Sequence, residues 1–285
     1  MALSTKIKNW LNFSIFNRFN LYIETLTYEK RESQRIELLD KKDYFDTPVF
    51  PVPECFASAN TEIIFEALSN SKSKLAKFQS TSLNDVGYTY KNDFYSSPDA
   101  EVLYIMLNIT KPKLFLEIGS GNSTKIARQS IKDHGLSTKI CSVDPQPRTE
   151  IDLLCDEVIR KPVESMSIDR FSELSSGDIL FIDSSHKILP GNDVTFLYLN
   201  ILPILKKGVI IHIHDIFLPF EYPKAFIDEK REWNEQHLVQ VLLETSKSFE
   251  VLWPGHFLQK TRKDFGSYFD NLENRAAQSL WLRKV

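Results

Sequence analysis

The chain has 285 residues, a formal net charge of −3 and a pI of about 6.1. This length can bury a large core, and the charge gives no basic footprint, so we expect no nucleic-acid partner. Three cysteines in no metal-binding spacing favour a reducing cytoplasm over a disulfide framework. No apolar run is long enough to span a bilayer, and the first residues show no signal-peptide pattern.

Residues 1–95 are expected to form a mainly helical N-terminal extension. Its first twenty residues mix basic side chains with apolar ones, namely Trp10, Leu11, Phe13, Ile15, Phe16 and Phe19. One interpretation is an interfacial helix that contacts a membrane or a partner. The other is a helix that covers the core or the interface of a homo-oligomer. We favour the second, because the apolar residues do not keep to one helical face.

The rest of this extension gives weaker signals. Three prolines in residues 48–56 predict a linker, and residues 60–78 predict a helix. The aromatic segment 88–95 could form a substrate lid, but we prefer an ordinary loop with surface tyrosines. Ser97, Pro98 and Asp99 then predict the start of a helix that runs to about Asn108.

A strand, a glycine turn and a helix follow each other closely between residues 113 and 134. Residues 114–118 are apolar apart from Glu117 and predict a buried strand. Gly119 and Gly121 allow a sharp turn and let a ligand lie against bare main chain. Asn122 and Ser123 are expected to cap the following helix. The pattern predicts the first βα unit of a doubly wound nucleotide-binding sheet.

The residues around this turn favour S-adenosylmethionine over NAD. A dinucleotide fingerprint has a third glycine where this chain has Thr124. Glu117 lies two residues before Gly119 and can assist in holding the ammonium group of S-adenosylmethionine, whereas it would gain nothing beside a pyrophosphate. A plain tight turn is the alternative for the motif on its own.

Two further acids follow the next strands. Residues 139–143 predict strand two, and Asp144 comes after it, about 25 residues beyond the turn, where an acid can accept the ribose hydroxyls. A capping or turn aspartate is the alternative. Residues 157–160 predict a short third strand, and Glu164 behind it could line the adenine.

Four ionisable side chains fall where strands four and five end. Strand four is expected at 178–183 and strand five at 208–215. Asp183, His186, His214 and Asp215 should therefore meet at the carboxyl edge of the sheet, where ligands bind. We favour a functional role for the set over separate structural roles, such as Asp183 capping a helix. His212 is expected only to pack.

The remaining elements complete the sheet. Helices are expected at 192–206 and 229–247, a sixth strand at 249–253 and a terminal strand at 279–283. A closing hairpin at the end of a doubly wound sheet is typical of methyltransferases and not of most dehydrogenases.

Residues 113–285 resemble a class I S-adenosylmethionine-dependent methyltransferase, and within that class the small-molecule and saccharide O-methyltransferases. The motifs that carry the resemblance are Glu117–Thr124, Ser142–Pro145, Phe181–His186 and His214–Phe217. The resemblance implies an α/β fold, a Rossmann-like doubly wound seven-stranded sheet with an antiparallel last strand, within residues 96–285. The resemblance implies Glu117, Gly119, Gly121 and Ser123 around the methionine end of the cofactor and Asp144 on the ribose. The expected cofactor-binding residues further include Ser120, Asn122, Pro145, Glu164 and Asp183.

Some members of this class also hold a magnesium ion. They use an aspartate after strand four and a Glu-Asp pair after strand five. Asp183 and Asp215 match, but His214 stands in place of the glutamate. Magnesium prefers oxygen ligands, so we expect a metal-free site rather than magnesium on Asp183 and Asp215.

The expected reaction is methyl transfer to a hydroxyl group of a small molecule or saccharide. A hydroxyl needs a base, and His186 is the first candidate because an unperturbed histidine titrates near neutrality. His214 is the second, and Asp183 or Asp215 would orient either ring. The Pro-Pro motif of many amine methyltransferases is absent after strand four. The alternatives are a nicotinamide-dependent oxidoreductase and a catalytically silent cofactor-binding scaffold.

Overall fold

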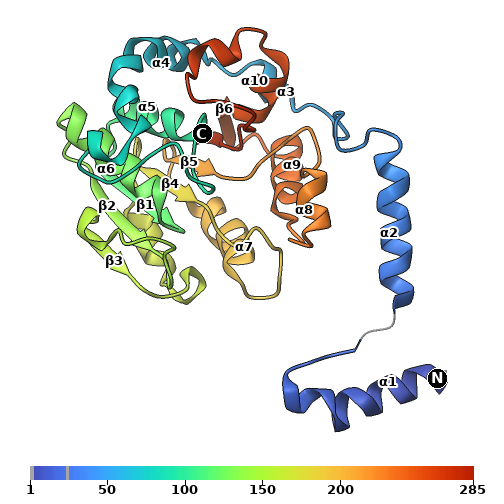
Figure 1. Ribbon diagram of the computed structural model, residues 1–285. Helices are drawn as coiled ribbons and strands as arrows, with labels where there is room; N and C mark the ends of the chain where they lie inside the picture. The colour runs from blue at the N-terminus through green and yellow to red at the C-terminus, as the bar shows by residue number, and fades with distance from the viewer. Residues whose placement is uncertain (1–2, 24–25) are drawn as a thin grey trace. The chain divides into compact units, whose positions relative to one another are not determined.

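The computed structural model describes residues 3–23 and 26–285, in two compact units, Met1–Thr47 and Pro48–Val285 (Figure 1). The first unit contains helix α1 (Leu3–Ser14), a 3-10 turn (Phe16–Phe19) and helix α2 (Leu26–Asp40). Trp10, Phe13 and Phe19 are exposed there. Within the described residues, no helix is both long and apolar enough to cross a bilayer. The division between units lies closer to the N-terminus than the domain boundary expected at 95/96.

The second unit is built on a seven-stranded sheet in the order β3-β2-β1-β4-β5-β7-β6. Its strands are β1 (Leu114–Ile118), β2 (Lys139–Val143), β3 (Glu157–Ile159), β4 (Ile179–Ile182), β5 (Ile210–Ile213), β6 (Phe249–Pro254) and β7 (Leu280–Lys284). Strands β1 to β5 are parallel, and β7 runs antiparallel to both β5 and β6. The predicted Rossmann-like sheet with an antiparallel last strand is confirmed.

Helices cover both faces of this sheet, as alternation along the strands requires. Phe115 of β1 packs into one apolar cluster, whereas Leu116 and Ile118 pack into the other. The first face is covered by α4 (Glu62–Leu75), α5 (Asp99–Thr110), α6 (Asn122–His134) and α10 (Gly255–Thr261); the second by α3 (Glu54–Ala57), α7 (Asp193–Phe196) and α9 (Glu235–Thr245). Figure 1 shows α4, α5 and α6 along one side of the sheet.

Three predicted helices have different bounds in the structure. Of the helix expected at 229–247, only α9 (Glu235–Thr245) is present; residues 229–234 form a loop after the short helix α8 (Lys224–Asp228), with positive φ at Lys230 and Glu232. The helix expected at 192–206 is α7 followed by a π-helical stretch (Leu197–Ile201) and a 3-10 turn that contains Pro203, which lacks an N–H donor. Helix α5 begins at Asp99, and Pro98 precedes it instead of being its first residue.

The tyrosines of segment 88–95 are core residues. Tyr88, Tyr90 and Tyr95 are each at most 5% exposed, so the expected loop with surface tyrosines is wrong, and they do not form an open lid either. The Tyr88 hydroxyl donates to the carbonyl of Tyr95, and the Tyr90 ring packs edge-on against Phe78. These tyrosines can be buried in the core because their hydroxyl groups have hydrogen-bond partners there.

Candidate functional site

The glycine turn after β1 is held tightly between the ends of β2 and β4. Gly119 has φ +78°, and its N–H donates to the Val143 carbonyl at 3.0 Å. A Cβ at Gly119 would lie 1.9 Å from the Asp183 carbonyl oxygen, so only glycine fits. A Cβ at Gly121 would meet only Thr149, at 3.8 Å. Gly121 itself is buried, so its contact with a ligand stays a prediction.

Glu117 fixes the start of α6 rather than facing an open site. Its side chain is fully buried, and its two carboxylate oxygens accept hydrogen bonds from the hydroxyls of Ser123 (2.7 Å) and Thr124 (2.5 Å). Burial, partly offset by these hydroxyls, raises its pKa to about 8. Asn122 and Ser123 are in the first turn of α6 and do not cap it, because the cap position is Gly121. A direct contact of Glu117 with the cofactor's ammonium stays a prediction.

Asp144 lies at the end of β2, directly beside the turn. Its Oδ2 accepts the N–H of Ser120 at 2.9 Å, and its Oδ1 accepts the N–H of Gln146 at 2.8 Å. The side chain is half-buried, which suits an acceptor for ribose hydroxyls at this edge. Pro145 and Glu164 are both exposed. Among the described residues, no contact of either side chain indicates a role, so their part in cofactor binding also stays a prediction.

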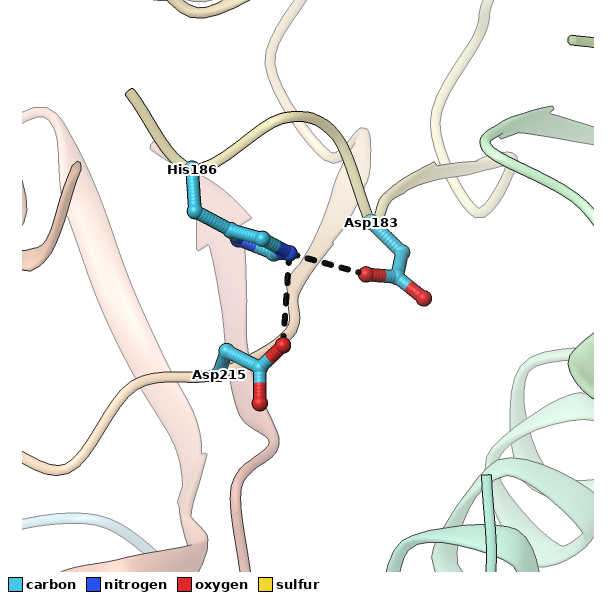
Figure 2. Close-up of side chains that lie close together, drawn as sticks. All are labelled: Asp183, His186 and Asp215. Atoms are coloured by element: carbon cyan, nitrogen blue, oxygen red, sulfur yellow. Dashed lines mark ion pairs between the residues drawn. The ribbon is translucent and has the colours of Figure 1, made fainter. Parts of the chain in front are cut away.

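The four ionisable residues expected at the ends of β4 and β5 do come together. His186 Nε2 lies 3.2 Å from Asp183 Oδ1 and 3.2 Å from Asp215 Oδ2. Figure 2 shows both carboxylates directed at this single ring nitrogen. His214 Nδ1 lies 3.4 Å from Asp215 Oδ2 and 3.8 Å from Asp183 Oδ1. We call Asp183, His186, His214 and Asp215 the acid–histidine cluster.

Two carboxylates outside the predicted set complete its surroundings. Glu235, the first residue of α9, is fully buried, and its Oε2 lies 2.9 Å from His186 Nδ1. Asp99 of α5 lies 3.7 Å from His214 Nε2 and accepts the N–H groups of Gln278 and Ser279. In the sequence Asp99 is explained by the helix dipole at a helix start, and Glu235 falls inside the helix expected at 229–247, so no local signal distinguishes either acid.

The backbone is strained at two members of the cluster. His186 has φ +60° and Asp215 has φ +58°, in the left-handed region that residues with a Cβ seldom adopt. Such strain costs about 1–3 kcal/mol per residue and gathers at functional sites. Here the strain directs both side chains to the same point.

The surrounding carboxylates change the protonation of both histidines. Burial opposes a charged imidazole, but hydrogen bonds to Asp183 and Glu235 and the charge of Asp215 outweigh it and raise the pKa of His186 to about 10. The pKa of His214 is likewise well above its ordinary value, because the charges of Asp215 and Asp183 outweigh burial. These partners favour the protonated ring, whereas a general base must be neutral, so the role of His186 as the base stays a prediction.

His212 packs in the sheet, as expected. It is fully buried, stacks on the Phe181 ring at 4.0 Å between centroids, and its Nε2 lies 3.0 Å from the Ser279 hydroxyl. Burial holds its pKa well below the ordinary value.

Residues 116–216 match a family model described as a methyltransferase domain. The match spans the glycine turn, Asp144 and the acid–histidine cluster, and the strand order with β7 between β5 and β6 agrees with it. These residues form a methyltransferase domain. This assignment disfavours the nicotinamide-dependent alternative.

Solved methyltransferase structures give a looser likeness. The S-adenosylhomocysteine-bound methyltransferase PaMTH1 of Podospora anserina is 14% identical, with 92% of this chain and 99% of that chain covered and a TM-score of 0.41. A Plasmodium falciparum protein described as a putative protein-L-isoaspartate O-methyltransferase, also in complex with S-adenosylhomocysteine, is 14% identical. The match covers 53% of this chain and 83% of that chain, with a TM-score of 0.33. No curated protein matches this chain.

S-Adenosylmethionine is the cofactor that the sequence predicts for this domain, and the residues around the turn are compatible with it. The Asp144 carboxylate lies beside the turn, where it accepts the N–H of Ser120 at 2.9 Å. S-Adenosylmethionine supplies an activated methyl group, so the protein has mainly to bind, orient and exclude water.

Proposed function

We propose that this methyltransferase transfers the methyl group to a hydroxyl oxygen of a small molecule or saccharide. The observation that supports this is the acid–histidine cluster, which lies at the ends of β4 and β5 and touches the turn through Asp183. A hydroxyl group becomes a good nucleophile only when its proton is removed, and a cluster rich in carboxylates favours that removal. A neutral amine needs no such cluster.

In this proposal Asp183 meets the acceptor and His186 positions it. The Asp183 side chain is 32% exposed, whereas those of His186 and Asp215 are 6% and 10% exposed. Burial opposes its ionisation, but the charge of His214 and the hydrogen bond from His186 lower its pKa to about 2, so it is ionised and can orient a hydroxyl. Protonated His186 holds Asp183 and Asp215 together.

Around the cofactor, we assign Asp144 to the ribose hydroxyls and residues 119–123 to the methionine end. Free Cys55, Cys141 and Cys155 support a reducing compartment, and we place the enzyme in the cytoplasm as part of the same proposal. A homo-oligomer and a membrane contact through residues 1–95 stay predictions.

The test is methyl transfer from S-adenosylmethionine to matched hydroxyl, amine and thiol acceptors, read as methylated product by mass spectrometry. We expect products from phenolic or sugar hydroxyls and none from the matched amines. Transfer only to amines would overturn the proposal. Binding of S-adenosylhomocysteine without transfer to any acceptor would instead support the silent scaffold.

Calorimetric titration with S-adenosylhomocysteine tests the cofactor site separately. Asp144→Asn should weaken binding about tenfold or more, because a charged hydrogen-bond acceptor contributes roughly 1.5–3 kcal/mol. Glu150→Gln, an exposed acid a few residues away, is the control and should bind like the parent. Unchanged affinity in folded Asp144→Asn would remove Asp144 from the site.

A further inference from the structure

We propose that Asp183, His186 and Asp215 bind a divalent first-row transition-metal ion, and that Glu235 orients His186 for this ion. The three residues each offer one ligand atom, and these atoms all lie within 4.8 Å of one another. The inference deepens the proposed function and rests on it for the ion's role, but metal binding can be measured without turnover.

The spacing of the ligand atoms fits a single ion. Two neighbouring ligands that each lie about 2.0–2.2 Å from one metal, in tetrahedral or octahedral arrangement, are about 2.8–3.6 Å apart. His186 Nε2 lies 3.2 Å from an oxygen of Asp183 and 3.2 Å from one of Asp215 (Figure 2). Each oxygen is therefore spaced from the ring nitrogen as two ligands of one metal are, and the two oxygens lie within 4.8 Å of each other.

Glu235 supplies the partner that a metal-binding histidine usually has. Such a histidine donates its other ring N–H to a carboxylate, which fixes the ring and raises its basicity. Glu235 Oε2 accepts the hydrogen bond of the His186 Nδ1–H group, which leaves Nε2 free to bind the ion. The segment is held rigidly, because the N–H groups of Asn234 and Glu235 both donate to the His186 carbonyl and the Trp233 ring packs 4.3 Å from the imidazole.

The charge of the region indicates a cation. Four carboxylates, those of Asp99, Asp183, Asp215 and Glu235, surround two imidazoles. Within residues 3–23 and 26–285, no lysine or arginine forms an ion pair with any of them. Even with both rings protonated, the group carries an excess of two negative charges when all four acids are ionised. A divalent ion offsets this excess, which is costly to bury.

An unpartnered buried atom points to the same place. His214 Nδ1 is buried without a hydrogen-bond partner and lies 3.4 Å from Asp215 Oδ2 and 3.8 Å from Asp183 Oδ1. Buried polar atoms are almost always satisfied in native proteins, so an exception needs an explanation. An ion or its ligands between the two aspartates explains it.

The donor set selects the kind of metal. Magnesium suits sites made of oxygen ligands, and one imidazole with two carboxylates suits Mn²⁺, Fe²⁺, Co²⁺ or Zn²⁺. The sequence suggested His214 as the nitrogen that disfavours magnesium, whereas the structure places His186 against both aspartates. When bound, such an ion would hold the acceptor hydroxyl and lower its pKa.

The test is titration of the metal-free full chain with Co²⁺, followed by visible absorption, and with Mn²⁺ and Mg²⁺ by calorimetry. We expect one Co²⁺ or Mn²⁺ per chain and at least tenfold weaker binding of Mg²⁺. His186→Ala should weaken Mn²⁺ binding tenfold or more, and Glu235→Gln by about 10- to 100-fold. His237→Ala and Glu232→Gln, on α9 and just before it, are matched controls and should bind Mn²⁺ like the parent.

Asp183→Asn is the second variant, because its partly exposed side chain can change without loss of the fold, and it should also lose affinity. If the folded parent binds neither Mn²⁺ nor Co²⁺, the three residues form only an ion-pair cluster and the inference is overturned. Equal affinity for Mg²⁺, or unchanged affinity in both His186→Ala and Asp183→Asn, would overturn it too. Metal binding without methyl transfer would leave the inference standing and contradict the proposed function instead.

Discussion

At the scale of single residues, burial acts on Glu117 and His186 with opposite results. Glu117 is buried with only hydroxyl partners, so the neutral acid is favoured and burial raises its pKa to about 8. His186 is almost as buried, yet its carboxylate partners favour the charged ring. The partners decide which form is stable, because a buried charge is tolerated only when it is paired.

Glu117 makes a prediction about stability and pH. Its folded pKa of about 8 lies above the ordinary value of 4.5, so the folded state keeps a proton that the unfolded chain releases between these values. The free energy of unfolding should therefore fall as pH rises from about 4.5 to about 8, by at most about 1.4 kcal/mol per pH unit for this group. Glu117→Gln cannot titrate, so its unfolding free energy should fall less steeply over this range.

Urea unfolding of the cofactor-free protein at several pH values from 5 to 8 measures the difference. Glu66→Gln, which changes an exposed acid on α4, should keep the slope of the parent. The slope contributed by His186 is present in all three proteins and cancels in the comparison. Parallel curves for Glu117→Gln and the parent would contradict the prediction.

At the scale of elements, the turn after β1 joins the cofactor region to the acid–histidine cluster. Gly119 packs against the backbone carbonyl of Asp183, whose side chain belongs to the cluster. The N–H of Asp183 in turn donates to the Ile118 carbonyl at 2.9 Å. Because β1 and β4 are hydrogen-bonded neighbours, this contact sets where Asp183 lies relative to the turn.

We expect Gly119→Ala to lower the free energy of unfolding by about 3 kcal/mol or more, from left-handed strain plus the clash with Asp183. Gly87→Ala is a matched control, because Gly87 also has positive φ but has open space around its Cα. It should lose only about 1–2 kcal/mol. Chemical denaturation measures both. Equal losses in the two variants would show that the contact with Asp183 does not matter.

The strands and the members of the acid–histidine cluster could be predicted because their signals are local. Each buried strand is a short apolar run, and a polar residue after such a run must lie at the carboxyl edge of a parallel sheet. Glu235 and Trp233 could not be predicted, because they reach His186 through a loop that replaces the start of the helix expected at 229–247. The raised pKa of His186 could not be predicted either, since it depends on partners that are distant in sequence.

At the scale of the whole molecule, residues 48–95 belong to the core of the methyltransferase unit. Phe65 of α4 packs against Trp253 of β6, with ring centroids 4.9 Å apart, and against Phe265. Phe78 is fully buried and packs against Tyr104 of α5. These contacts join α4 to β6, and the 3-10 turn that follows α4 (Ala76–Gln79) to α5. A domain that began at residue 96 would expose several large aromatic side chains.

Two truncated chains test this boundary. Residues 48–285 should fold cooperatively and bind S-adenosylhomocysteine with nearly the affinity of the full chain, because the sheet, the turn and the acid–histidine cluster all lie in this unit. Residues 96–285 should aggregate or unfold well below the melting temperature of the full chain, because truncating one buried aromatic side chain alone costs about 3–5 kcal/mol and this deletion removes several. Circular dichroism melts and calorimetric titration separate the outcomes. If residues 96–285 fold and bind as well as residues 48–285, the aromatic contacts of α4 are dispensable, and the boundary expected at 95/96 is the better one.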